Sequence, residues 1–360
     1  MNGSIIVSQS REQLADELYS YRDSPPIPLS VSPWIAMSLL QKAIRRGEVE
    51  IALSAAASLL LSSPDRLWRR IGAAAFEEIG VADLDTVSLV TSALAGKRFR
   101  SSIGGDWKVA SFAVERMAKS LKCRSADDLL LTAELHPRFA RARTALATKS
   151  IGELVKISTG SAALPVRALA AWFACGTHPR QTKLLSLRRG EPTVAFDQMC
   201  EAGLPHTVVE IAREGYRTLG LPLCPFLALL SPHALLEDSS SCDDVFPESS
   251  TIGPVPSWCL DMYTREGRAA LSRFLGLNCE TARWVRDHLR PPHRVNFVGT
   301  VLFRVEGGLV RHRAQWSLAE ELRRRVDIEC HAPPCNDGTE LLGWMRNDIR
   351  ALNEERSNVG

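Results

Sequence analysis

The sequence predicts an all-α fold, built as an array of many helices joined by short turns. Apolar residues recur at helical spacing along most of the chain, most clearly from residue 33 to residue 95. Glycine, proline and serine stand where helices would begin and end. Alternation of apolar and polar residues, which is typical of strands, occurs near residues 298–313. We therefore expect a multi-helix array with a possible small β-hairpin at 298–313.

The stretch 33–95 has the clearest helical pattern. Its first helix carries an apolar stripe formed by Leu39, Leu40, Ala43 and Ile44. Its basic residues are predicted to lie on the opposite face: Lys42, Arg45 and Arg46. Gly47 is expected to end this helix as a left-handed cap, since glycine adopts that conformation without steric cost.

Three more helices are predicted in the same stretch. Residues 48–61 form a helix with a face of small residues, which lets a neighbouring helix approach closely. Ser63, Pro64 and Asp65 are typical of a helix start, and this third helix should reach Ile79 and Gly80. A fourth runs from residue 84 to residue 95. Short turns between consecutive helices favour antiparallel packing.

The remaining elements follow from the same signals. Residues 99–107 are expected to form a loop because of Gly104 and Gly105. For residues 298–313 two alternatives stay open, a hairpin turning at Gly307-Gly308 or a helix broken there. Elsewhere we expect helices over residues 10–21, 107–122, 125–134, 137–148, 151–158, 164–175, 193–202, 207–219, 258–275, 278–289, 318–326 and 341–352.

Composition shifts divide the chain into four consecutive segments. Residues 1–32 contain a proline-rich stretch and are expected to be an N-terminal arm or linker. Residues 33–230 form the main helical domain. Residues 231–257 are rich in Ser, Asp and Pro and predict a linker or surface loop. Residues 258–360 form a smaller, mainly helical C-terminal domain.

The overall composition is that of a soluble globular protein. The chain has 360 residues, of which 45% are hydrophobic and 24% charged. It has no apolar run of the roughly 18 residues needed to cross a bilayer, so we expect no membrane association. A secretory signal pattern is also missing at the N-terminus, and the nine cysteines show no regular spacing. We expect a cytoplasmic protein with reduced, mostly buried cysteines.

Charge is distributed unevenly along the chain. Residues 66–189 contain 21 Lys and Arg against 10 Asp and Glu. Such a surface would neutralise the backbone phosphates of DNA, giving salt-dependent and sequence-independent affinity. The residues predicted to contact DNA are Lys97, Arg98, Arg100, Lys108, Arg116, Lys119, Lys122, Arg124, Arg138, Arg141 and Arg143.

Each basic cluster also has a structural interpretation. Lysines and arginines at these spacings can form solvated helix faces with no ligand. Phe99 and Trp107 could stack on bases beside the basic residues, or they could anchor the core. Glu77 and Glu78 are expected to belong to a surface ion network that neutralises a neighbouring helix.

The sequence contains no recognisable catalytic motif. It lacks a Walker A loop and a GxGxxG motif, so we expect neither an enzyme nor a bound cofactor. Cysteine and histidine at metal-ligand spacing occur at Cys330, His331 and Cys335. A zinc ion needs four ligands, so Cys279 or His293 would have to supply the fourth. This group is the basis of one alternative, a metal-dependent hydrolase or nuclease.

Residues 39–83 carry a family resemblance. A basic helix (Lys42–Arg46) is followed by an acidic turn (Glu48–Glu50) and an alanine-rich helix (Ala52–Leu61). A second basic helix carries Arg69 and Arg70, and the sequence AAAFEEIGVAD follows at its end. This succession resembles the C-terminal helical region of the RarA/MgsA (WRNIP-type) clamp-loader-like AAA+ ATPases, over about 50 of the 360 residues.

The resemblance implies an all-helical collar that drives oligomerisation next to a DNA-acting ATPase. This chain lacks the ATPase module, and beyond Lys97 it departs from the family pattern. The resulting hypothesis is a non-enzymatic accessory protein of DNA replication, repair, recombination or mobile-element maintenance. It would bind DNA through a basic face and assemble with itself or with an AAA+ ATPase partner. The alternative is a helical scaffold that binds protein and no nucleic acid.

Overall fold

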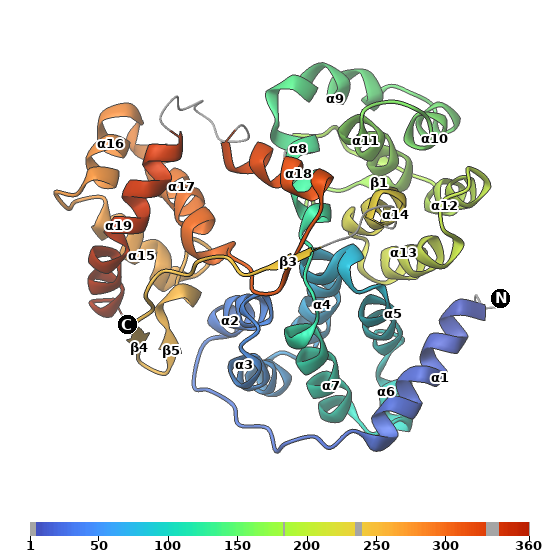
Figure 1. Ribbon diagram of the computed structural model, residues 1–360, viewed down its shortest axis with the longest axis horizontal. Coiled ribbons are helices and arrows are strands. Elements are labelled where there is room, and N and C mark those ends of the chain that lie inside the picture. Colours follow the sequence, from blue (N-terminus) through green and yellow to red (C-terminus); the bar gives the residue numbers. More distant parts are fainter. Residues whose placement is uncertain (1–4, 183, 235–239, 329–337, 360) are drawn as a thin grey trace. The chain divides into compact units, whose positions relative to one another are not determined.

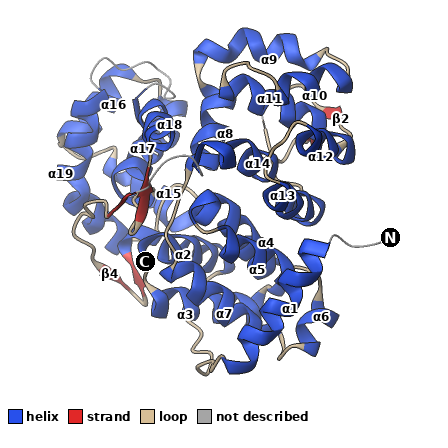
Figure 2. Cartoon of the chain, turned by 45° about the vertical axis from the view of Figure 1, so that its right-hand side comes forward, coloured by secondary structure: helices blue, strands red, loops and turns tan. Residues whose placement is uncertain are grey.

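Helices account for most of the computed structural model, which describes residues 5–182, 184–234, 240–328 and 338–359 (Figure 1). The few strands are short, as Figure 2 shows in red. The predicted all-α fold is therefore confirmed. Among the described residues, none of the helices combines the length and apolar character needed to span a membrane.

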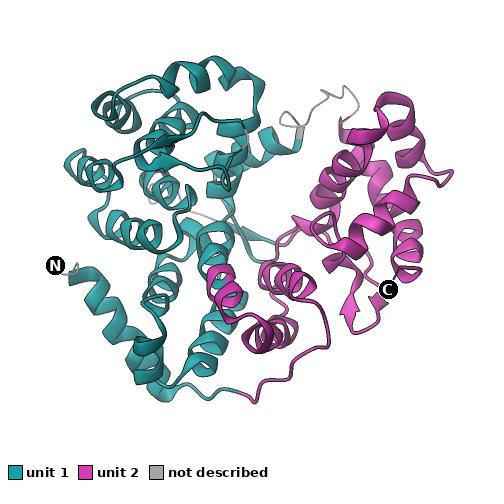
Figure 3. Ribbon diagram, turned by 180° about the vertical axis from the view of Figure 1, so that it is seen from behind, with its two compact units in different colours: residues 1–23, 71–242, 312–334 teal, residues 24–70, 243–311, 335–360 magenta. Residues whose placement is uncertain are grey.

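The chain forms two compact units, each made of three separate stretches of sequence (Figure 3). Unit 1 contains residues 1–23, 71–242 and 312–334, and unit 2 contains residues 24–70, 243–311 and 335–360. The four consecutive segments expected from composition (1–32, 33–230, 231–257 and 258–360) differ from this division. The chain passes from unit 2 to unit 1 inside helix α4 (Pro64–Ala74).

Unit 1 contains most of the helices. After α4 come the π-helix η1 (Ala75–Ile79) and the 3₁₀ turn η2 (Gly80–Ala82). Two small antiparallel sheets, β1–β2 and β3–β6, also belong to it. Its other elements are α1 (Ile5–Ser20), α5 (Leu84–Ala93), α6 (Lys97–Ser102), α7 (Asp106–Lys119), α8 (Ser125–Leu135), η3 (Pro137–Phe139), α9 (Ala140–Ala147), α10 (Ile151–Thr159), α11 (Leu164–Cys175), β1 (Gly176–Thr177), β2 (Arg188–Arg189), α12 (Pro192–Glu201), α13 (His206–Leu219), α14 (Leu223–Ala234), β3 (Ser240–Cys242), β6 (Arg313–Gln315) and α18 (Ser317–Ile328).

The core of unit 1 is built around α11 and α14. Helix α11 packs against α8, α9, α10, α12 and α14. Trp172 of α11 meets Phe226 of α14 edge to face at a centroid distance of 6.1 Å, and both side chains are fully buried. Helix α14 escaped sequence analysis because its apolar residues run almost continuously, so no helical stripe stands out.

Helix α1 is an integral part of unit 1. It packs against α5, α7 and α13, with Leu14 and Leu18 each only 1% exposed. The expected arm at residues 1–32 therefore contains a core helix. Extended chain follows from Tyr21 to Ser32, where the prolines forbid helix.

Unit 2 pairs an N-terminal helical hairpin with the C-terminal helices. The hairpin is formed by α2 (Pro33–Arg46) and α3 (Val49–Ser62), which pack along each other. The other elements are β4 (Thr251–Ile252), β5 (Val255–Pro256), η4 (Ser257–Cys259), α15 (Arg265–Phe274), α16 (Glu280–His288), α17 (Pro291–Leu302), the π-helix η5 (Phe303–Gly307) and α19 (Gly338–Ser357).

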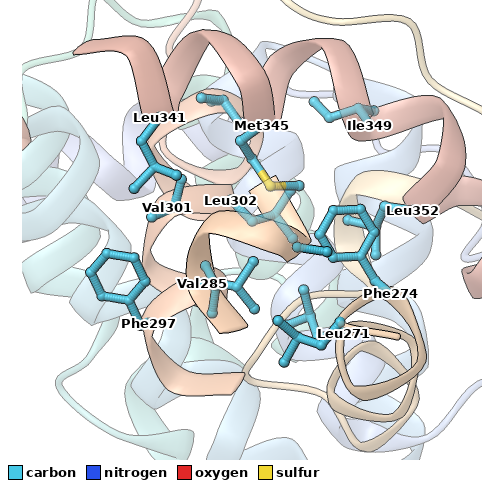
Figure 4. Close-up of a cluster of buried hydrophobic side chains, with 14 of the residues drawn as sticks. Leu271, Phe274, Val285, Phe297, Val301, Leu302, Leu341, Met345, Ile349 and Leu352 are labelled. Atoms are coloured by element: carbon cyan, nitrogen blue, oxygen red, sulfur yellow. The ribbon is translucent and has the colours of Figure 1, made fainter. Parts of the chain in front are cut away.

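The C-terminal helices of unit 2 enclose an apolar core (Figure 4). Helix α19 contributes Met345, which is fully buried and faces side chains of α15, α16 and α17. The labelled members of this core are Leu271, Phe274, Val285, Phe297, Val301, Leu302, Leu341, Met345, Ile349 and Leu352. Spacings of three and four residues along α19 place its members on one face of that helix.

The helices predicted between residues 33 and 95 are confirmed. Gly47 has φ +70°, and its N–H bonds to the carbonyls of Ala43 and Ile44, as expected for a left-handed cap. The third helix changes at Ala75 from α to π geometry and reaches Ile79, as expected. The basic residues of the first helix, Lys42, Arg45 and Arg46, are buried as well, because they satisfy groups of unit 2 described below.

Two other expectations need correction. Residues 99–107 are not all loop, since α6 covers Lys97–Ser102 between Gly96 and Gly104. The helix expected at 258–275 begins only at Arg265, where the Thr264 side chain caps it by accepting from Gly267 N. Between the two alternatives for 298–313, the helical one is correct. Helix α17 continues through η5 to Gly307, and Arg313 starts a strand that pairs with β3 instead.

Candidate nucleic-acid interface

The eleven basic residues predicted to contact DNA all lie in unit 1, between α6 and α9. Their surroundings divide them into two groups. One group is buried or held by carboxylates, and the other is exposed.

Arg100 and Arg116 are held by carboxylates. Arg100 is only 7% exposed, and its Nε lies 2.6 Å from Asp106 Oδ1. Arg116 forms ion pairs with Glu17 and with Asp85, the second at 2.6 Å. Lys119 is exposed but pairs with Glu115 one helical turn earlier. A cation whose charge is already matched by a carboxylate adds little to the attraction for phosphate.

Lys122 is completely buried. Its Nζ donates to the carbonyl oxygens of Ala118 and Ser120, each at 2.8 Å. Both acceptors lie around the C-terminal end of α7, where a cation is favoured by the helix dipole. Lys122 is therefore a structural residue, and its prediction as a DNA contact was wrong.

Arg124 is the counter-ion of Glu78. Its Nη1 lies 2.8 and 2.7 Å from the two oxygens of Glu78, which has no exposed surface. Asp127 also pairs with it, and Glu77 lies 3.6 Å away. Burial acts to lower the pKa of Arg124, but these carboxylates raise it well above its usual value. The ion network expected for Glu77 and Glu78 exists, but it is largely buried and not on the surface, and its cation Arg124 is not available to DNA.

Few of the predicted DNA contacts in α6 and α7 are exposed. Lys97 and Arg98 are exposed on α6, and Lys108 is half-buried on α7. Residues 66–135 as a whole contain 11 Lys and Arg against 9 Asp and Glu, so this half of the predicted basic region is nearly neutral. Phe99 lies beneath the guanidinium of Arg11 at 5.8 Å, which supports the structural interpretation of that ring.

The charge excess lies instead in residues 136–190. This segment contains 10 Lys and Arg and a single acid, Glu153. Glu153 is exposed and pairs with Lys149 at 2.9 Å. The backbone and side chain of Ser150 and the Lys149 ammonium lower the pKa of Glu153 to about 2, so it is ionised at neutral pH.

Three arginines of this segment donate to carbonyl groups at the C-terminal ends of helices. Arg143 Nη1 donates to Ala133 O and His136 O at the end of α8, both at 3.1 Å. Arg188 Nη1 donates to Lys149 O at 2.8 Å beyond α9, and Arg167 Nε donates to Ser158 O at 2.9 Å in α10. These carbonyls fix the guanidinium groups in place, and the helix dipole offsets only part of their positive charge, whereas a carboxylate would carry a full opposite charge.

The loop between β1 and β2 lies against the same helices. In the short ladder Gly176 pairs with Arg189 and Thr177 with Arg188. Thr182 Oγ1 donates to Glu134 Oε1 at 2.5 Å, which fastens the loop to the end of α8. The bond from Arg188 to Lys149 O holds β2 at the turn between α9 and α10.

These contacts define what we call the α9–β2 basic surface. Its members are exposed or half-buried: Arg138, Arg141, Arg143, Lys149, Arg180, Arg188 and Arg189. The bonds of Arg188 and Thr182 thus join the segment that carries Arg138, Arg141 and Arg143 to a loop about 40 positions later in the chain. Sequence analysis omitted Arg180, Arg188 and Arg189, although the local ratio of basic to acidic residues would have indicated them.

Of the five predicted metal ligands, the structure describes only two. Cys330, His331 and Cys335 lie outside the described residues. Cys279 is half-buried at the start of α16, and burial raises the pKa of its thiol. His293 is exposed near the start of α17. Comparison with known proteins found no matching family model, no matching curated protein and no matching solved structure.

Proposed function

We propose that this protein is a non-enzymatic DNA-maintenance accessory protein that binds nucleic acid through the α9–β2 basic surface. The observation that carries the proposal is the ten-to-one excess of basic residues in 136–190. Arginines there donate to helix carbonyls rather than to carboxylates, so they can still attract phosphates.

Such a surface favours the nucleic-acid backbone over the bases. A guanidinium group can donate two parallel hydrogen bonds to a phosphate, and each neutralised phosphate releases a counterion. The expected affinity is therefore insensitive to sequence and falls steeply with salt. Because every nucleic acid carries the same phosphates, single-stranded and duplex DNA should both bind.

The wider context of the proposal comes from residues 39–83. Their resemblance to the collar of RarA/MgsA-type ATPases supports a role in replication, repair or recombination, with self-assembly or an AAA+ ATPase partner. A cytoplasmic location accords with the seven described cysteines, all of which are free thiols.

The test is a fluorescence-anisotropy titration of labelled duplex and single-stranded DNA at several salt concentrations. The double variant Arg138→Glu/Arg141→Glu reverses two exposed charges on the basic surface. We expect it to weaken binding at least tenfold at low salt. The slope of log affinity against log salt should also become shallower by about 2, since about 0.9 is lost per phosphate contact.

Two matched variants make the test specific to this surface. Arg265→Glu/Arg350→Glu makes the same change of charge in unit 2, where Arg350 is 94% exposed, and should leave binding within about twofold. Lys97→Glu/Arg98→Glu measures the contribution of α6. No DNA binding at low salt would overturn the proposal and favour the protein-binding scaffold. Equal loss in all three variants would show a general charge effect and would overturn the assignment to the α9–β2 basic surface.

A further inference from the structure

Helices α12 and α13 bring together three side chains of the kinds that bind transition metals. They are Cys200 near the end of α12, His206 at the start of α13, and Glu210 one turn later. One ligand atom of each lies within 4.8 Å of the other two. Cys200 and Glu210 are half-buried and His206 is exposed, so the cluster opens to solvent on one side.

The turn between the two helices holds this arrangement. Its backbone bonds back onto α12, from Ala202 N to Gln198 O, from Gly203 N to Cys200 O and from Leu204 N to Met199 O, at 2.9 to 3.1 Å. Behind the turn, Phe196 of α12 and Tyr216 of α13 pack at a centroid distance of 6.0 Å. His206 and Glu210 are four residues apart, which places them on one face of α13.

Charged groups around the cluster suit a divalent cation. Burial raises the pKa of the Cys200 thiol; Arg213 acts to lower this pKa, and the carboxylates of Glu210 and Asp197 act to raise it. Arg213 Nη2 lies 2.7 Å from Asp197 Oδ1, and its Nε lies 3.1 Å from Glu210 Oε1. With Cys200 as a thiolate, three anionic groups would face one cation, leaving two negative charges for a metal to balance. A carboxylate has lone pairs enough to keep Arg213 on one side and a metal on the other.

We propose that Cys200, His206 and Glu210 form a binding site for a transition-metal dication of the zinc class. One thiolate, one imidazole and one carboxylate form a mixed S, N and O ligand set, which Zn²⁺ accepts and which hard ions such as Mg²⁺ do not prefer. Three protein ligands leave the fourth tetrahedral position for water. Arg213 positions the Glu210 carboxylate from outside the ligand set, as groups bonded to metal ligands commonly do.

The spacing of the ligand atoms is compatible with this assignment. Zinc bonds of about 2.0 to 2.3 Å place tetrahedral ligand atoms about 3.5 Å apart. Because all three ligand atoms lie within 4.8 Å of one another, no pair has to approach by more than about 1.3 Å. Rotation of the exposed His206 side chain can supply most of that, because solvent surrounds it. The site is independent of the α9–β2 basic surface and of the proposed DNA binding.

The probe is Co²⁺, which reports its ligands by absorption. The full-length protein, freed of metal by a chelator and kept reduced, is titrated with Co²⁺ in the absence of nucleic acid. We expect a thiolate-to-cobalt charge-transfer band at one equivalent, with the visible bands of tetrahedral cobalt, and displacement of both by Zn²⁺. Cys200→Ser should abolish the charge-transfer band. His206→Ala, which removes an exposed side chain, should weaken cobalt binding at least tenfold.

Two controls separate this site from the rest of the chain. Cys330→Ser/Cys335→Ser removes the other cysteine-containing candidate and should leave the spectrum unchanged. His178→Ala removes an exposed histidine elsewhere in unit 1 and should do the same. Absence of a charge-transfer band in the unaltered protein would overturn the proposal. Persistence of the band in Cys200→Ser, or its loss in Cys330→Ser/Cys335→Ser alone, would also overturn it.

Discussion

Buried ion pairs explain why the basic residues of this chain are poor guides to its surface. In unit 1 Arg124 clamps Glu78, and in unit 2 Arg356 clamps Glu306 with Nη2–Oε2 at 2.6 Å. The desolvation cost of burying such a pair roughly offsets its Coulomb attraction, so the pair adds little net stability. Removing one partner leaves the other charged and buried.

The pair of Glu78 and Arg124 provides a stability test at the scale of the residue. Glu78→Gln leaves the Arg124 guanidinium buried without its main counter-ion. We expect it to lower the free energy of unfolding by about 3–5 kcal/mol. Urea unfolding followed by circular dichroism measures the change.

A second pair of variants checks the cause of that loss. Glu354→Gln breaks an exposed pair with Arg350 at 4.0 Å and should cost no more than about 0.5 kcal/mol. Replacing both buried partners, as Glu78→Leu/Arg124→Met, should recover most of the stability lost in Glu78→Gln. A double variant as unstable as Glu78→Gln would show that the charge pair is not the reason.

At the scale of elements, both units use a π-helix to bury a glutamate. Helix α4 continues as η1, which carries Glu78, and α17 continues as η5, which carries Glu306. Each π-helix is followed by a capping glycine, Gly80 or Gly308, whose N–H bonds back to the first carbonyl of the π segment. The wider π turn changes the direction of the side chains that follow, which an α-helical pattern cannot anticipate.

The N-terminal cap of helix α5 makes the stability of the folded chain depend on pH. Asp83 precedes it and accepts hydrogen bonds from Thr86 N at 2.9 Å and Thr86 Oγ1 at 2.6 Å. Burial acts to raise the pKa of Asp83, but these hydrogen bonds, one from Ser120 and the charge of Arg116 outweigh it, and the pKa is lowered. The ionised Asp83 carboxylate therefore contributes its full stabilisation of the folded state above the unfolded-state pKa of about 3.9. This contribution is lost as the pH falls through the folded-state pKa of Asp83.

The matching variants separate charge from capping geometry. Asp83→Asn keeps an acceptor for Thr86 N but has no charge to titrate, so the loss of stability between pH 5 and pH 2 should be smaller than in the unaltered protein. Asp83→Ala loses the cap as well and should cost about 0.5–2 kcal/mol at pH 7. Unfolding free energies across this pH range give both quantities. An identical acid response in Asp83→Asn would exclude Asp83 as a contributor.

At the scale of the whole molecule, each unit depends on stretches that are far apart in sequence. In unit 2, Lys42 of α2 donates to Trp258 O at 2.9 Å. Its Nζ also forms an ion pair with Asp261 Oδ2 at 2.7 Å. Arg45 donates to Gly307 O, and Arg46 lies 4.9 Å from the Trp258 ring centroid. The basic face of α2 is therefore internal to unit 2.

This arrangement predicts the behaviour of a fragment. Residues 258–360, expected from composition to form a domain, lack α2 and α3. Alone, the fragment would expose the surface around Trp258 and leave Asp261 without its counter-ion. We expect it to show helical far-ultraviolet circular dichroism but no cooperative thermal transition. Adding residues 24–70 in trans should restore a transition. Cooperative unfolding of 258–360 alone would instead support the consecutive domains.

Local patterns in the sequence were enough to predict the all-α class, most helices and the Gly47 cap. Apolar spacing, helix starts and glycine caps depend on neighbours within a few residues, and these neighbours are visible in the sequence. The local ratio of charges in 136–190 was equally visible. It indicates the α9–β2 basic surface better than the same ratio over residues 66–189, because the longer window includes residues 66–135, where basic and acidic residues nearly balance.

Only the tertiary structure decided which charged residues face solvent and which stretches share a core. The sequence pattern of a helix with Lys42, Arg45 and Arg46 on one side is the same whether that side faces solvent or is buried against Asp261. The difference depends on residues more than 200 positions away. Cys200, His206 and Glu210 likewise become a cluster only when the turn after α12 folds back. The sequence by itself therefore determined local conformation, while long-range packing determined burial, ion pairing and the candidate sites.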